Sequence, residues 1–83
     1  MTQAQELKIK EIVAKILKIN LDNICNETGP LNTAEWDSFC HMQILSEIEN
    51  HFKIEFDPNV IPNIIAIKDI ILHVNNSLLE KST

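Results

Sequence analysis

Residues 35–54, which read Glu-Trp-Asp-Ser-Phe-Cys-His-Met-Gln-Ile-Leu-Ser-Glu-Ile-Glu-Asn-His-Phe-Lys-Ile, decide the fold of this chain. Apolar side chains recur in this stretch at three- and four-residue spacing, which is typical of one buried helix face. They are Met42, Leu45, Ile48 and Phe52, with Ile44 beside them. Asp37 or Ser38 can cap the helix, because a short side chain accepts from free backbone N–H groups. The stretch therefore predicts a helix from this pair to about residue 53.

Helices are also predicted on both sides of this stretch. The apolar spacing of residues 3–18 and of residues 67–80 favours two amphipathic helices. Pro58 and Pro62 bracket the segment 58–65, which has room for only a turn or two of helix. Ala66 offers no capping oxygen, so a frayed start is expected for the last helix.

A long connection, residues 19–37, joins the first two helices. Gly29 and Pro30 prevent a helix there. Its spread of apolar residues predicts that the connection packs against the core: Leu21, Ile24, Leu31 and Trp36. The chain is therefore expected to be one all-α domain over residues 1–83, a small bundle of three longer helices and one short helix.

Charge and composition exclude several functions. The chain has 83 residues and a net charge of −5, and its acidic residues concentrate in the segment 21–69. Nucleic-acid binding needs a basic patch, and no apolar run reaches the ~20 residues of a membrane span. A basic partner protein suits the acidic middle of the chain better. Cys25 and Cys40 are expected to be free thiols in the cytoplasm, since no secretory leader is visible.

Catalytic and metal-binding patterns are absent from the sequence. His41, His51 and His73 are scattered, and no pair has the spacing that places two metal ligands on one helix face. No glycine-rich phosphate loop or nucleophile motif is present. Trp36 is expected to pack the connection onto the bundle, and His41 to be a surface imidazole. We therefore expect no enzymatic activity and no metal.

Ser38 is the residue most suited to chemistry. It follows a long loop at the start of a helix, so its hydroxyl should be exposed. A phosphate ester there would lie at the positive end of the helix dipole. On the dipeptide alone, a simple capping pair is the favoured interpretation.

The wider pattern resembles the acyl carrier protein family of phosphopantetheine-attachment domains. The resemblance covers residues 5–79 and rests on Asp37-Ser38-Phe39 followed at helical spacing by Met42, Leu45, Ile48, Glu49, Phe52 and Ile54. It implies an acyl-carrier-like four-helix bundle, with 4′-phosphopantetheine attached to Ser38 by a separate phosphopantetheinyl transferase that takes it from coenzyme A. Asp37 would support loading by helping to orient magnesium in the transferase.

The resemblance also implies partner-binding residues. Glu47 and Glu49 would belong to an acidic recognition helix exposed to solvent, and Phe39, Ile54 and Phe56 would complete the docking surface. Ile54, Phe56 and Ile64 would lie near the opening between the second and third helices of the bundle. Further partners would be an acyl- or aminoacyl-loading ligase and a downstream synthase or transferase, and the carrier is expected to be monomeric.

Departures from the family pattern indicate a discrete carrier for a dedicated pathway. Phe39 stands where the family usually has leucine. Cys40, His41 and Gln43 carry no negative charge, so the acidic patch that usually follows the serine is reduced. Three alternatives for function remain: an acyl carrier of fatty-acid, polyketide or other dedicated biosynthesis, a D-alanyl or peptidyl-type aminoacyl carrier, and an unmodified helical interaction module.

Overall fold

Three α-helices form the frame of the protein. The computed structural model describes residues 3–81, which form α1 (Gln3–Leu17), η1 (Leu21–Asn23), α2 (Ser38–Phe52), η2 (Ile61–Asn63) and α3 (Ile67–Lys81). All three predicted longer helices are confirmed, and the described residues contain no strand. The all-α class follows.

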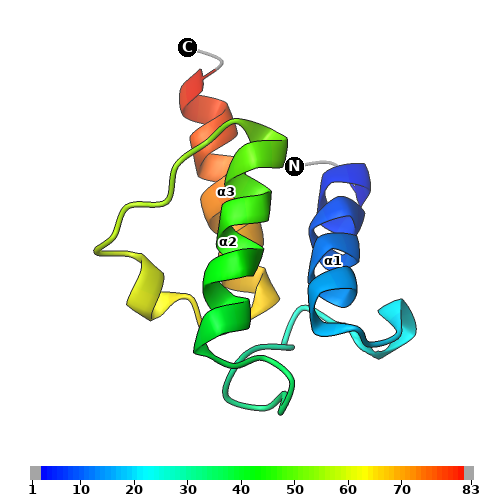
Figure 1. Cartoon of the computed structure of the whole chain (residues 1–83). Coiled ribbons are helices and arrows are strands. Elements are labelled where there is room, and N and C mark those ends of the chain that lie inside the picture. The colour runs from blue at the N-terminus through cyan, green and yellow to red at the C-terminus, as the bar shows by residue number, and fades with distance from the viewer. Residues whose placement is uncertain (1–2, 82–83) are drawn as a thin grey trace.

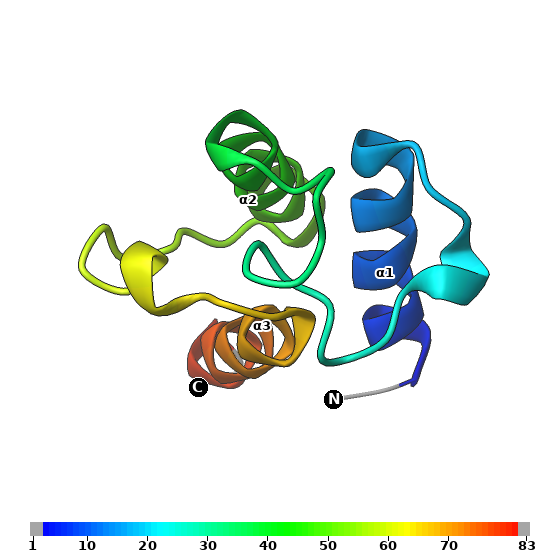
Figure 2. The same cartoon turned by 90° about the horizontal axis from the view of Figure 1, so that it is seen from below.

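α1 is the helix that holds the other two together. It packs against both α2 and α3, and it runs antiparallel to α2 (Figure 1). Seen from below, the segment that contains η2 lies on the side of α2 and α3 away from α1 (Figure 2). One core therefore forms where the inner faces of the three helices meet.

Isoleucine dominates that core. Its fully buried side chains come from all three helices and include Ile9, Val13, Ile44, Ile48, Ile67, Ile70 and Val74. Met42 was predicted to be buried, but its side chain is 50% exposed, and Phe52 is only half-buried. Met42 lies about 120° around the helix from Ile48. Ile44, Leu45 and Ile48 form the inner face instead, so Met42 is at its edge.

The predicted short helix between Pro58 and residue 65 is reduced to one 3-10 turn, η2. A second such turn, η1, was not predicted, and Asn20 caps it by accepting the backbone N–H of Asp22 at 3.1 Å. The described residues thus form three α-helices and two single turns rather than four helices.

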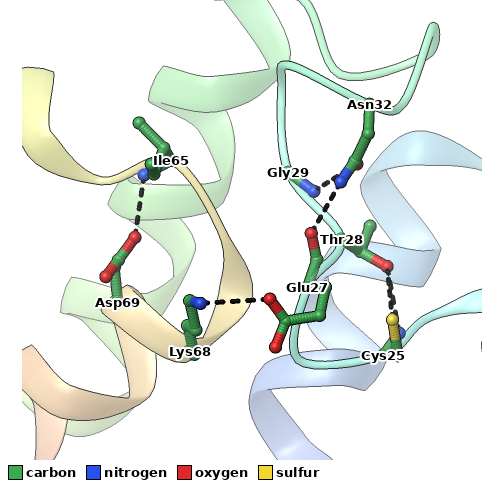
Figure 3. Close-up of polar contacts among 8 residues, drawn as sticks. All are labelled: Cys25, Glu27, Thr28, Gly29, Asn32, Ile65, Lys68 and Asp69. Atoms are coloured by element: carbon green, nitrogen blue, oxygen red, sulfur yellow. Dashed lines mark hydrogen bonds and ion pairs between the residues drawn. The ribbon is translucent and has the colours of Figure 1, made fainter.

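The long connection caps α3, so the prediction of a frayed start is wrong. The backbone N–H groups of Ile67 and Lys68 donate to the carbonyls of Thr28 at 2.8 Å and Asn26 at 3.0 Å. Figure 3 shows the neighbouring polar contacts, including the exposed Lys68–Glu27 ion pair at 3.0 Å. These two carbonyls accept from backbone N–H groups at the start of α3 that the side chain of Ala66 cannot satisfy. A search for a capping residue next to the helix in sequence does not detect them.

Gly29 permits the close approach on which this junction depends. A Cβ atom there would collide with the carbonyl oxygen of Ile65 and lie 2.7 Å from its carbonyl carbon and 2.9 Å from Ala66 Cα. Asn32 closes the turn, since its Oδ1 accepts the Gly29 N–H at 3.0 Å and its Nδ2 donates to the Glu27 carbonyl at 2.8 Å. The backbone of the connection touches the backbone of Ile65 and Ala66 because Gly29 has no side chain.

The connection is also anchored by two of its apolar residues. Ile24 and Trp36 are buried, as predicted, and Leu21 is half-buried. Leu31 is 82% exposed, so the prediction that it packs on the core is wrong. It lies inside the turn closed by the Asn32 N–H to Gly29 carbonyl bond, which directs it away from the core.

Asp37 sets the start of α2. Its backbone is extended, and its Oδ1 accepts the N–H of Cys40 at 2.8 Å. The Cys40 backbone N–H, and next the Cys40 side chain, hold the pKa of the Asp37 carboxyl below its ordinary value. The helix ends at Lys53, whose left-handed backbone donates its N–H to the Glu49 carbonyl.

Gly29→Ala should destabilise the protein by about 1–3 kcal/mol, because the new methyl group meets backbone atoms that cannot move aside cheaply. Urea unfolding followed by circular dichroism measures the effect. The control Glu35→Ala changes an exposed side chain of the same connection and should cost less than about 0.5 kcal/mol. Equal stability of the two variants would contradict the close contact.

Asp37→Asn should lower stability at neutral pH and lose that effect in acid. A carboxylate with a lowered pKa stabilises the folded state above its ordinary value of about 3.9, and this contribution disappears as pH falls through the folded value. The amide keeps an acceptor for the cap but does not titrate. The difference in stability between the two proteins should therefore shrink as the pH falls below the ordinary pKa and vanish below the folded pKa, whereas a pH-independent difference would contradict the assignment.

Candidate functional site

Ser38 is the first residue of α2, at the point where the long connection ends. Its side chain is exposed, and its hydroxyl has no hydrogen-bond partner among residues 3–81. The connection meets α2 at the end of the bundle away from the start of α1 and the end of α3 (Figure 1). The hydroxyl is therefore accessible to another protein.

Asp37 and Ser38 have different roles at the start of α2. Asp37 caps the helix, so the hydroxyl of Ser38 is not used as a cap. The carboxyl group is exposed and its lowered pKa keeps it ionised. The capping interpretation of the dipeptide accounts for Asp37 and leaves Ser38 without a structural role.

A buried tryptophan fixes the chain just before Ser38. Trp36 is 2% exposed, which confirms that it packs the connection onto the bundle, and its indole N–H donates to Nδ1 of His41 at 2.9 Å. His41 is half-buried and was wrongly expected to be an idle surface imidazole. Because the indole nitrogen is always a donor, Nδ1 of His41 is the acceptor in this bond.

An apolar groove opens beside Ser38, and we call it the attachment groove. It has a volume of about 560 Å³ and lies between the start of α2, the connection and η2. Its apolar lining includes Leu31, Met42, Ile61, Ile64 and Ile65. Ile64, which was predicted to lie near the opening between the second and third helices, lines this groove, and sequence reasoning did not place the other four beside Ser38. The isoleucines around Pro62 were a signal for such a lining.

Ile54 and Phe56 are placed differently from the prediction. They are only 6% and 7% exposed, belong to the core, and do not line the attachment groove. Both side chains are buried, whereas Glu55 between them is exposed. In this conformation they do not form a docking surface with Ser38.

The two acidic residues of α2 have different surroundings. Glu47 is exposed, as predicted, but Glu49 is half-buried and accepts the Phe56 N–H through Oε2 at 2.7 Å. Glu49 therefore ties α2 to the segment that follows it. No carboxylate or lysine lies between Asp37 and Glu47, so the half of α2 next to Ser38 is uncharged apart from its cap.

Phe39 is the predicted partner-binding residue nearest to Ser38, and it is 72% exposed. Cys40 is half-buried, and burial, followed by its hydrogen bond to Asp37, raises the pKa of its thiol. Cys25 is exposed, and its hydrogen bond to the Thr28 side chain lowers the pKa of its thiol. Both cysteines are free, as expected.

Residues 3–81 hold no cluster of three or more side chains suited to a metal ion. None of the helices described here has the length and apolar character required to cross a bilayer.

Comparison with known proteins agrees with this geometry. Residues 7–74 match the family described as phosphopantetheine attachment site. The chain is 38% identical over 77 residues to a protein of Mycoplasma genitalium named acyl carrier protein homolog, covering 90% of this chain and 89% of the relative. It is 31% identical over 71 residues to the acyl carrier protein of Buchnera aphidicola subsp. Schizaphis graminum, covering 86% of this chain and 90% of the relative.

The residues around Ser38 fit a covalent prosthetic group, since an exposed, unbonded hydroxyl at a helix N-terminus lies beside an apolar groove. The family match spans more than half of the chain, and both relatives align over most of their length. The chain therefore belongs to the acyl carrier protein family of phosphopantetheine-attachment domains, whose members carry covalently attached 4′-phosphopantetheine.

Proposed function

We propose that Ser38 is the attachment residue and that the protein carries an acyl group to partner enzymes. The observation that carries this proposal is the exposed Ser38 hydroxyl, which is left without a hydrogen bond because Asp37 supplies the cap. A phosphopantetheinyl transferase would join the Ser38 oxygen to the phosphate of the pantetheine half of coenzyme A and release the adenosine half. When bound, the prosthetic group supplies a terminal thiol that holds the cargo as a thioester.

The chain's own residues suit this role by position rather than by catalysis. The positive end of α2 favours a negatively charged phosphodiester at Ser38. Trp36, through His41, fixes the chain leading into α2, and the ionised Asp37 beside the attachment residue is suited to help orient magnesium in the transferase. A carrier of this kind is a substrate of enzymes and needs no catalytic pair itself.

The attachment groove favours an acyl cargo over an aminoacyl cargo. Its lining is largely apolar, with Met42, Ile61 and Ile64 among its walls, and apolar surface gains free energy by covering an alkyl chain. We propose a monomeric carrier in the cytoplasm, loaded by an acyl ligase and used by a synthase or transferase of fatty-acid, polyketide or another dedicated biosynthesis. A D-alanyl or peptidyl-type carrier is the alternative within the same family.

Incubation with coenzyme A, magnesium and a broad-specificity phosphopantetheinyl transferase should add the mass of one phosphopantetheine. Ser38→Ala should abolish the gain while circular dichroism stays unchanged, because the lost hydroxyl makes no internal bond. The matched control Ser46→Ala removes another exposed serine of α2 and should leave loading unchanged. Intact-protein mass spectrometry measures all three.

Loading of Ser38→Ala, or no loading of the unchanged protein by several transferases, would reject this proposal. The second result would favour an unmodified helical interaction module. With the loaded protein, fatty-acyl and aminoacyl ligases offered in turn separate the two kinds of cargo, and transfer by the aminoacyl ligase alone would overturn the acyl assignment.

The two glutamates of α2 should respond differently to charge reversal. Glu47→Lys should slow transferase loading and weaken its salt dependence, with a stability change within about 0.5 kcal/mol, because the side chain is exposed. Glu49→Lys should cost about 1–3 kcal/mol, because it leaves the Phe56 N–H without its acceptor. Loading kinetics and urea unfolding distinguish the two.

Glu49→Gln is the control for this pair, since the amide oxygen can still accept from Phe56. Its loss of stability should be smaller than that of Glu49→Lys. Equal losses for both Glu49 variants, or a large loss for Glu47→Lys, would show that the orientation of this part of α2 is wrong.

A further inference from the structure

A second groove runs between α1 and α2, and we call it the α1–α2 groove. It has a volume of about 640 Å³. Its α1 wall consists of Lys8, Glu11, Ile12, Lys15 and Ile16, and its α2 wall of Phe39, Met42, Gln43, Ser46, Glu47 and His51. The two helices are antiparallel (Figure 1), so the end formed by Lys15 and Phe39 lies next to Ser38.

Large apolar side chains are exposed to solvent in this groove. Phe39 and Met42 are 72% and 50% exposed, and Ile12 and Ile16 are half-buried against the core cluster. Covering such surface gains free energy roughly in proportion to the apolar area removed from water. Clusters of exposed apolar side chains with polar edges are typical of protein interaction sites.

The charged side chains at the edges of the groove also form no ion pair with other described residues. Within residues 3–81 the ion pair is Lys68–Glu27, and Lys8, Glu11, Lys15 and Glu47 have no ion-pair partner. Two of the three charges on the α1 wall are lysines. They lie seven residues apart, which is two helical turns or about 10.5 Å along the helix axis.

We propose that the α1–α2 groove docks a helical segment of a partner enzyme. The segment presents an apolar ridge to Ile12, Ile16, Phe39 and Met42, and two carboxylates seven residues apart to Lys8 and Lys15. This inference goes beyond the proposed function, because it assigns an acidic docking element to a carrier whose net charge alone predicts a basic partner. The lining of the groove includes Phe39, the residue after Ser38, but not Ser38 itself.

The chemistry of the groove favours this occupant over a purely apolar one. An apolar ligand would leave both lysines without partners, whereas carboxylates at two-turn spacing form charge-assisted hydrogen bonds with them. Glu11, between the two lysines on the α1 wall, and Glu47, on the opposite wall, are positioned to repel carboxylates placed elsewhere on the segment. The segment is therefore amphipathic, with its carboxylates confined to the edge that faces α1.

Two synthetic helical peptides test the proposal on the unmodified chain, so the outcome does not depend on loading of Ser38. The first has leucines along one face and two glutamates seven residues apart on one edge, and the second has lysines in place of these glutamates. Amide shifts in ¹⁵N-correlated NMR spectra locate the binding site, and titration gives the affinity. Translational diffusion measured on the same samples reports whether the chain self-associates.

The glutamate peptide should shift the amides of the groove residues and bind at least about tenfold more tightly than the lysine peptide. Lys8→Glu with Lys15→Glu should reverse that order. The control, Lys10→Glu with Lys18→Glu, makes the same charge change on lysines outside the groove and should preserve it. Phe39→Ala should weaken binding, while Leu72→Ala, which removes an exposed leucine of α3, should not.

The proposal fails if neither peptide binds, if the lysine peptide binds as tightly as the glutamate peptide, or if the shifts map to the attachment groove. It fails equally if diffusion shows that a second copy of the chain covers the α1–α2 groove. Normal loading of Ser38 alongside any of these results would leave the carrier function intact and reject only the docking site.

Discussion

The contact between the long connection and the start of α3 is the constraint on which the rest of the structure depends. Gly29 lets two backbones touch, and the carbonyls of Asn26 and Thr28 then cap α3. This junction closes the molecule at the end where α2 begins. With the burial of Trp36, it turns a long loop into a fixed support for Ser38. Ser38 is thus placed by packing between segments far from it in sequence.

The helix start itself resolves a competition between two roles. A side-chain oxygen at the start of a helix can accept a backbone N–H as a cap, or it can remain without a hydrogen bond and be accessible to another molecule. Asp37 takes the cap and Ser38 keeps an unbonded hydroxyl. The hydrogen bond from Cys40 lowers the pKa of Asp37, so the capping group is a carboxylate at neutral pH.

The surroundings of Ser38 are suited to brief contacts with several enzymes. Two grooves flank the start of α2, and Met42 lines both of them. One is mainly apolar, whereas the other combines apolar residues with charged side chains that have no ion-pair partner among the described residues. Rim charges chiefly govern the rate of encounter, so weak docking and rapid exchange are compatible. The exposure of Met42, which its helical spacing did not predict, gives the surface its apolar character near Ser38.

The sequence by itself determined the three helices, the position of Ser38 and its family, because helical periodicity and the Asp37-Ser38 start are local patterns. Only the tertiary structure decided which side chains are used and how. It buried Ile54 and Phe56, exposed Leu31, engaged Glu49 with the Phe56 N–H and formed both grooves. Periodicity gives the apolar face of a helix to within about one residue's rotation of 100°. Burial at the edges of that face depends on what packs there from distant parts of the chain, which no local pattern contains.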